Sequence, residues 1–219
     1  MNEIELKQLW QASNERLEKS MELSSRQAED ITHLKVQNFM SSMKPVKIFT
    51  IVAGILWVGI VGKIIVSLMI AAPSEVSMFF IISATAQVCL TAVALIIYVY
   101  QLITIWRIDI SQPLLVTQER LAELRASTLW VTRILFLQLP FWTTFYWNES
   151  MMANGSLLLW IVQLLITVLF TYVAAWLFLN INYSNKEKRW FRLLFNGREW
   201  DPIIRSMDLL EQIDEYKRE

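Results

Sequence analysis

The sequence predicts an all-α integral membrane protein with four transmembrane helices and amphipathic cytoplasmic helices at both ends. Four mostly apolar segments are each long enough, at about 1.5 Å per residue, to cross a hydrocarbon core of about 30 Å. A large soluble bundle, the alternative, would show a polar face at a helical period, and these segments are apolar almost all round. The predicted spans cover about residues 48–70, 78–105, 128–147 and 157–181, within a transmembrane domain of residues 45–181.

The basic residues predict the orientation of the chain. Of the 20 Lys and Arg side chains, seven precede the first span, three lie between spans two and three, and eight follow span four. The other two, Lys63 and Arg133, lie inside spans, and the two remaining connectors have none. Because cytoplasmic loops are enriched in Lys and Arg, we expect both termini and the central connector in the cytoplasm. No signal-peptide pattern precedes the first span, so that span should act as its own insertion signal.

Residues 1–44 form the predicted cytoplasmic N-terminal region. The stretch SSRQAED, with Ser24 and Gln27 in capping-box register, predicts a break between two helices. Seven acidic and seven basic side chains up to Lys47 leave this region neutral, whereas a nucleic-acid-binding arm would be basic. Pro45 predicts the boundary with the first span, because the residue before a proline is biased away from the helical region.

Two further cytoplasmic segments are predicted. Residues 109–127 have the pattern of a helical stalk that begins at Ser111 and Pro113 and extends the third span. Residues 182–219 should form a juxtamembrane helix and a C-terminal helix. The juxtamembrane helix mixes basic and aromatic side chains, a composition that suits the anionic inner leaflet. Its predicted membrane-surface residues are Lys186, Lys188, Arg189, Trp190 and Arg192.

Apolar stripes on the terminal helices are candidate docking surfaces for a protein. Asp201 and Pro202 fit the N-cap and first-turn positions of the last helix, and an apolar stripe follows them. Such a stripe has to bury itself against the same chain, a second subunit or another protein. The predicted partner-docking residues are Leu9, Trp10 and Leu17 near the N-terminus and Ile203, Met207, Leu210 and Ile213 near the C-terminus.

Each predicted span carries one strongly polar side chain at a similar depth: Lys63, Gln87, Gln138 and Gln163. A lysine at the centre of a span costs about 2.5–3.5 kcal/mol on insertion scales, so glutamine carbonyls facing the bundle interior would solvate its ammonium. This layer is either structural glue that satisfies polar groups in lipid, or a binding or permeation site for an anion or a polar headgroup. Pro140 should kink the third span beside Gln138.

Sequence motifs for catalysis or cofactor binding are lacking. His33 is the only histidine, which excludes a histidine-rich metal site. The five glycines form neither a phosphate-binding loop nor a dinucleotide fingerprint, and no pair of carboxylates lies in an apolar setting. We therefore expect a protein that is not an enzyme and that binds no cofactor or metal.

Four stretches, IELKQLW, SSMKPVKIFTIVAGILWVG, QPLLVTQERLAELRASTLWVTRILFLQLPFWTTFYW and FNGREWDPIIRSMDLLEQIDEY, resemble a family of uncharacterised four-span membrane proteins of the Bacteroidetes. The resemblance covers nearly the whole chain. Such proteins are often encoded next to sigma-factor or other transcription-regulator genes, which implies membrane-tethered control of such a partner. It implies no functional residues.

Together these expectations describe a multi-pass protein of the bacterial inner membrane with cytoplasmic termini. Its expected role is that of an interaction or regulatory protein that docks a cytosolic partner, or forms a homo-oligomer, through its terminal helices. The alternative is a small transporter or channel subunit that uses the polar layer around Lys63. No binding of nucleic acid is expected.

Overall fold

The computed structural model describes residues 3–71, 76–107, 114–195, 200–206 and 208, and within these ranges all regular secondary structure is helical. Two long apolar segments form helices close to the expected bounds, since α2 and α6 are apolar on nearly every face. Residues 201–206 are also helical. The elements are α1 (Glu3–Ala71), α2 (Met78–Arg107), α3 (Leu114–Phe136), α4 (Leu139–Thr144), α5 (Glu149–Asn154), α6 (Leu157–Asn180), the 3-10 helix η1 (Tyr183–Asn185) and α7 (Arg189–Phe195).

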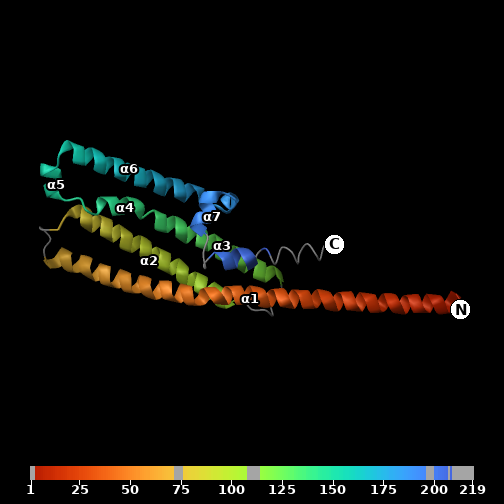
Figure 1. Ribbon diagram of the computed structural model, residues 1–219. Helices are drawn as coiled ribbons and strands as arrows, with labels where there is room; N and C mark the ends of the chain where they lie inside the picture. Colours follow the sequence, from red (N-terminus) through yellow and green to blue (C-terminus); the bar gives the residue numbers. More distant parts are fainter. Residues whose placement is uncertain (1–2, 72–75, 108–113, 196–199, 207, 209–219) are drawn as a thin grey trace.

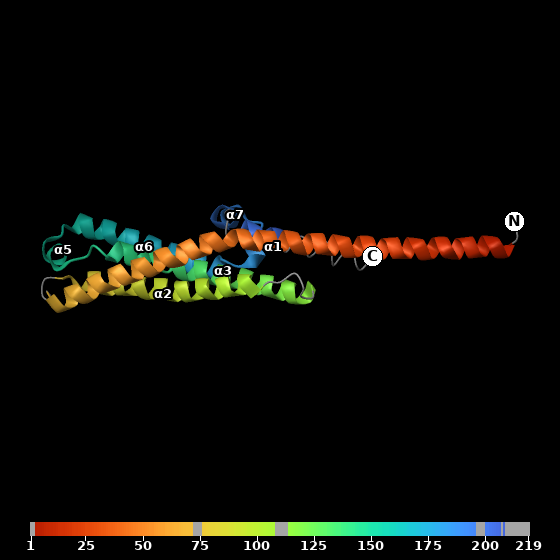
Figure 2. The same cartoon turned by 90° about the horizontal axis from the view of Figure 1, so that it is seen from below.

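Helix α1 is uninterrupted over 69 residues, and its N-terminal half projects beyond the other described helices (Figures 1 and 2). The expected break near Ser24 is therefore wrong. Serine costs only about 0.5 kcal/mol of helix propensity relative to alanine, which is too little to end a helix by itself. Glu22 and Arg26 also form an ion pair of 2.7 Å across the same turn, which supports the helix there.

The expected helix boundary at Pro45 is wrong as well, because Pro45 lies inside α1. A proline in a helix interior removes one backbone hydrogen bond and costs about 3 kcal/mol. Met43 and Lys47, on either side of it, are both completely buried. Tertiary packing of these flanking residues offsets the cost, as it commonly does for helices whose stability comes from packing.

The third predicted span, residues 128–147, consists of two helices and not one. Helix α3 continues from the expected stalk to Phe136 without a break, and residues 137–138 form a turn. Pro140 lies in the first turn of α4, where its missing N–H has no helical acceptor to lose. The structure thus shows a helix break where the sequence predicts a kink.

The long helices pack in a series and do not form a closed bundle. Helix α1 packs on α2, α2 packs on α3 and α4, and α6 packs on α3 and α4, so that α1 and α6 are the two outer helices (Figure 1). Among the described residues, three helices are long and apolar enough to cross a membrane, within residues 30–71, 78–107 and 157–180. The pieces of the third predicted span are each too short or too polar to count among them.

Candidate functional site

A buried lysine joins the first three long helices. Nζ of Lys47 in α1 donates a hydrogen bond of 2.7 Å to Oε1 of Gln101 in α2, and it lies 4.1 Å from the ring centroid of Tyr98. Nε2 of Gln101 in turn lies 3.4 Å from Oγ1 of Thr128 in α3, whose hydroxyl donates to the carbonyl of Leu124. Lys47 and Gln101 are both 0% exposed. We call Lys47, Gln101 and Thr128 the lysine centre.

An apolar cluster lies directly beside the lysine centre, towards the N-terminus of α1. Val36, Met40 and Met43 of α1 pack with apolar side chains of the other elements, namely Ile105 of α2, Leu121 and Leu124 of α3, and Ile203. With Thr32 and Lys47, these three residues of α1 recur every three or four positions, the spacing of one helix face. We call residues 32–47 of α1 the root, because this segment is fixed to three other parts of the chain.

The segment of α1 before the root has no such packing. Every side chain that the structure describes from Trp10 to Ile31 is exposed. Five of them are large and apolar: Trp10, Leu17, Met21, Leu23 and Ile31 are 69%, 56%, 66%, 61% and 52% exposed. We call residues 10–31 the arm. Four of the five, Trp10, Leu17, Met21 and Ile31, lie on one side of the helix, and we call them the arm stripe; Leu23 lies on another side.

Two members of the arm stripe, Trp10 and Met21, lie in line with the buried face of the root. Ile31 does not, since Ser42, eleven residues further on, is exposed. Trp10, Met21, Thr32 and Met43 follow one another at intervals of eleven residues, which is close to three helical turns. The same line along α1 is therefore covered by α2, α3 and residues 201–206 at the root, and is open on the arm. Arm ion pairs lie on a different face: Glu15 pairs with Lys19 at 2.8 Å, and Glu22 with Arg26.

The predicted docking residues fall into three groups. Trp10 and Leu17 are exposed on the arm as expected. Ile203 is 0% exposed and belongs to the cluster at the root, so its own chain covers this side chain, which is not open to a partner. The described part of the chain does not include Met207, Leu210 and Ile213, nor the side chain of Leu9.

The predicted polar layer does not form a single site. Lys63 is exposed on α1, and no hydrogen bond given for the described residues joins it to a glutamine. Gln138 donates to Oγ1 of Thr91 at 3.0 Å, and Gln163 donates to the carbonyl of Thr143 at 2.6 Å. The expectation that these glutamines surround the ammonium is wrong, because a helix turns about 100° per residue and Lys63 lies on another face of α1.

Two polar side chains of the predicted spans instead satisfy free backbone carbonyls at helix ends. Thr143 lies in the last turn of α4, where carbonyls have no intrahelical partner, and Gln163 of α6 supplies the donor. Nε of Arg133 in α3 donates at 2.7 Å to the carbonyl of Ile181, which ends α6. These bonds tie α4 to α6 and α3 to the end of α6. Gln87 differs, since its Nε2 is buried without a hydrogen-bond partner in the described structure.

The predicted membrane-surface residues lie at one end of α6. Lys186, Lys188, Arg189 and Arg192 are exposed, whereas Trp190 is half-buried with its ring centroid 4.9 Å from that of Trp176. The apolar face of α7 packs inward in a cluster with α3 and α6, whose buried members are Leu129, Leu177, Ile181, Phe191, Phe195 and Trp200. Helix α7 therefore presents its cations outward and its aromatic rings to the chain.

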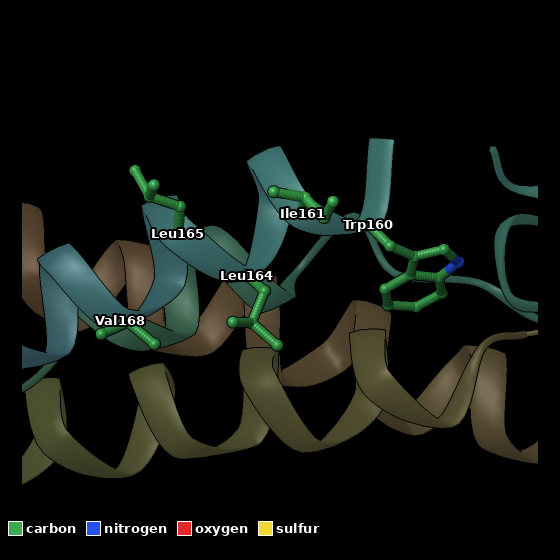
Figure 3. Close-up of a pocket in the computed structure, with 5 residues that line it drawn as sticks. All are labelled: Trp160, Ile161, Leu164, Leu165 and Val168. Atoms are coloured by element: carbon green, nitrogen blue, oxygen red, sulfur yellow. The ribbon is translucent and has the colours of Figure 1, made fainter. Parts of the chain in front are cut away.

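A groove lies on α6, and the side chains that line it are apolar apart from one indole N–H. It has a volume of about 470 Å³ and is lined by Trp160, Ile161, Leu164, Leu165 and Val168, which all project from α6 (Figure 3). Such a lining suits hydrocarbon. Among the described residues no cluster of three His, Cys, Asp or Glu side chains is placed to hold a metal ion.

Sequence reasoning missed the lysine centre. Lys47 lies just before the first apolar span, where the sequence predicts a cytoplasmic cation, and Gln101 is one of two glutamines in the second predicted span. The available signal was spacing, because Lys47 follows Met40 and Met43 at intervals that place all three on one helix face. A cation on an apolar face needs a polar partner, and Gln101 lies near the matching end of α2.

In the part of the chain that the structure describes, the fold is that of an all-helical protein with three helices of membrane-spanning length and apolar composition. Comparisons with protein-family models, with curated proteins and with solved structures found no match to this chain. Membership of the Bacteroidetes family that the sequence resembles stays a prediction.

Proposed function

We propose that this chain is a non-enzymatic, four-span protein of the bacterial inner membrane that docks a helical protein partner through its cytoplasmic arm. The observation that carries the proposal is the arm stripe, a line of exposed large apolar side chains on the part of α1 that packs on no other described element. Contiguous exposed apolar surface of this kind marks interaction sites, and an amphipathic helix docks by residues at helical spacing. Regulation of the partner is the role that the family resemblance implies.

The lysine centre and the apolar cluster explain how the arm is held. The root is buried among α2, α3 and residues 201–206, so the arm leaves the membrane-length helices in a fixed direction (Figure 1). A docking surface that is pre-organised in this way loses less conformational entropy on binding than a flexible tail. The arm therefore supports a defined complex.

Site-specific photo-crosslinking of the full chain in its native membrane tests this proposal. A photoreactive phenylalanine derivative replaces Leu17 on the arm stripe or, as the matched control, Lys19 on the face of the ion pairs. We expect a protein adduct from position 17 and none from position 19. Equal adducts at both positions, or none at position 17, would count against docking through the stripe.

A small transporter or channel subunit has less support. Gln138 and Gln163 bind groups of the protein itself, Lys63 is exposed, and the groove on α6 is lined by apolar side chains. A permeation site for an anion needs cations or donors that converge on one space. Flux in proteoliposomes that is abolished by Lys63→Met and not by Lys188→Met would favour this alternative.

A further inference from the structure

We infer that the helix which covers the arm stripe belongs to a second copy of this chain, and that the two arms form a short parallel coiled coil. This inference rests on the proposed function and names its partner. It follows from the heptad register of the arm, the placement of its charges and the direction that the membrane imposes.

The arm carries a regular heptad pattern over about three heptads. Trp10, Leu17, Ser24 and Ile31 are each seven residues apart, which places them at one core position, d. Asn14, Met21 and Ala28 are also seven residues apart and take the other core position, a. The next residues in the a series, Lys7 and Lys35, are charged and set the limits of the seam. Four of these seven positions, Trp10, Leu17, Met21 and Ile31, carry large apolar side chains, which is where the core residues of a coiled coil lie.

The charges of the arm suit two identical chains. Eight charged side chains occur from residue 10 to residue 31, and only Glu18 takes a position beside the seam (e or g); the other seven take the outer positions b, c and f. The two ion pairs, Glu15 with Lys19 and Glu22 with Arg26, join b to f within one helix. Charges at e and g select a different partner in heterotypic coiled coils, and here that selection is nearly lacking.

Asn14 gives the seam a register. A single asparagine at an a position favours two parallel helices in one register. In that register its amide can form a hydrogen bond with the amide of the equivalent asparagine in the second helix. Asn14 is exposed in the single chain, so it is free to face a second arm. Two chains inserted in one membrane also send their arms out in the same direction, which makes a parallel pair the natural arrangement.

Anchoring in the same membrane favours pairing of two arms that would be only marginally stable as an isolated coiled coil of about three heptads. Isolated coiled coils of about three heptads are marginal, as short helices generally are. Two arms anchored in one bilayer meet at a high effective concentration, which raises the apparent affinity without any new contact. The root keeps each arm helical before it pairs, since α1 continues through it without a break.

Disulfide formation in the full-length, membrane-embedded protein tests the inference. Cys89→Ser removes the single native cysteine, and Leu17→Cys or Ser24→Cys then places a thiol at a d position. Lys19→Cys and Arg26→Cys are the matched controls at f positions. We expect mild oxidation to yield several-fold more covalent dimer from positions 17 and 24 than from positions 19 and 26. Equal yields at all four positions, or dimer at neither d position, would overturn the inference.

The mass of the unmodified protein in lipid nanodiscs gives an independent reading. We expect twice the single-chain mass for the wild type. The double variant Leu17→Asp/Met21→Asp should have the single-chain mass. Its helical circular dichroism signal per residue should be unchanged, which shows that the variant still folds. A single-chain mass for the wild type, together with a photo-adduct of another protein at position 17, would reject the second copy and leave the proposed docking function standing. A single-chain mass with no adduct at position 17 would reject both.

Discussion

Nζ of Lys47 lies 2.7 Å from Oε1 of Gln101, 54 residues further along the chain, and this buried hydrogen bond fixes the root of the arm to α2. A buried cation is costly unless hydrogen bonds satisfy it. Here the hydrogen bond to Gln101 offsets the cost of burying the ammonium of Lys47, at the point where α1, α2 and α3 meet. The lysine centre therefore helps to determine the direction of the arm.

Replacement of Lys47 should destabilise the fold, and replacement of Lys63 should not. Lys47→Met leaves the amide oxygen of Gln101 buried without its donor, which costs about 1–3 kcal/mol of unfolding free energy. Lys63 is exposed on an apolar surface of α1, so Lys63→Met should keep or raise the stability. Thermal unfolding in nanodiscs measures both. A lower midpoint for Lys63→Met than for Lys47→Met would contradict the assignment of the structural lysine.

Two glutamines, the half-buried Gln163 and the buried Gln87, should respond in opposite ways to the same substitution. Gln163→Leu leaves the carbonyl of Thr143 unsatisfied and should lower the unfolding free energy by about 1–3 kcal/mol. Gln87 is 3% exposed and its Nε2 has no partner in the described structure, so Gln87→Leu should be neutral or stabilising. Chemical unfolding in detergent compares the two. An equal loss of stability would show that the amide of Gln87 makes a bond that the structure lacks.

Substitutions at the three glycines of α1 should have different effects on stability, because the space around each glycine differs. A Cβ added at Gly54 would lie 2.5 Å from Cδ2 of Leu95 in α2, whereas Cβ atoms added at Gly59 and Gly62 would have nothing within 4 Å. Gly54→Ile should therefore cost about 1–3 kcal/mol through overpacking. Gly59→Ala and Gly62→Ala should gain up to about 1 kcal/mol from helix propensity. Midpoints of thermal unfolding check this, and a stabilised Gly54→Ile would refute the close approach of α1 and α2.

The bond from Arg133 to Ile181 should hold the end of α6 and the segment after it. Arg133→Gln removes the charged donor, and hydrogen exchange should become faster in η1 and α7, whose aromatic residues pack beside Ile181. Lys188→Gln, an exposed cation on the same segment, is the control and should leave exchange unchanged. Faster exchange in the control alone would contradict the role of Arg133.

Substitutions on the arm stripe should leave the fold intact. Leu17 and Met21 are exposed in the single chain, so Leu17→Asp and Met21→Asp should each change the unfolding free energy by no more than about 0.5 kcal/mol. The measurement uses protein at a concentration where it carries the single-chain mass. A large loss of stability there would mean that the stripe is buried within its own chain.

The sequence predicts helices α2 and α6 almost to their ends, because an unbroken apolar run leaves little choice of structure. It fails at Pro45 and Pro140 for one reason. A proline disfavours a helix interior by about 3 kcal/mol, but only tertiary packing decides whether the helix continues, as at Pro45, or breaks, as at Pro140. That packing involves residues distant in the chain, which local patterns do not contain.

For the candidate site too, the sequence predicts the local features and misses those that depend on contacts between distant residues. Exposed Trp10 and Leu17 follow from a local pattern of apolar residues at helical spacing. The depth of Lys63 in its span is also readable from the sequence, but its direction is not, because one residue of rotation moves a side chain by about 100°. The pairing of Lys47 with Gln101 depends on which helices become neighbours, and no motif in the sequence encodes that.

The unbroken course of α1 also determines how far from the bilayer its tip can act. At about 1.5 Å per residue, the 38 residues from Trp10 to Ile48 span about 57 Å. If the first span begins at Ile48, Trp10 lies far beyond the headgroup layer. Only molecules that extend well beyond the bilayer surface meet the tip. Any insertion or deletion in the root would change both the distance of the tip from the bilayer and the direction in which it faces.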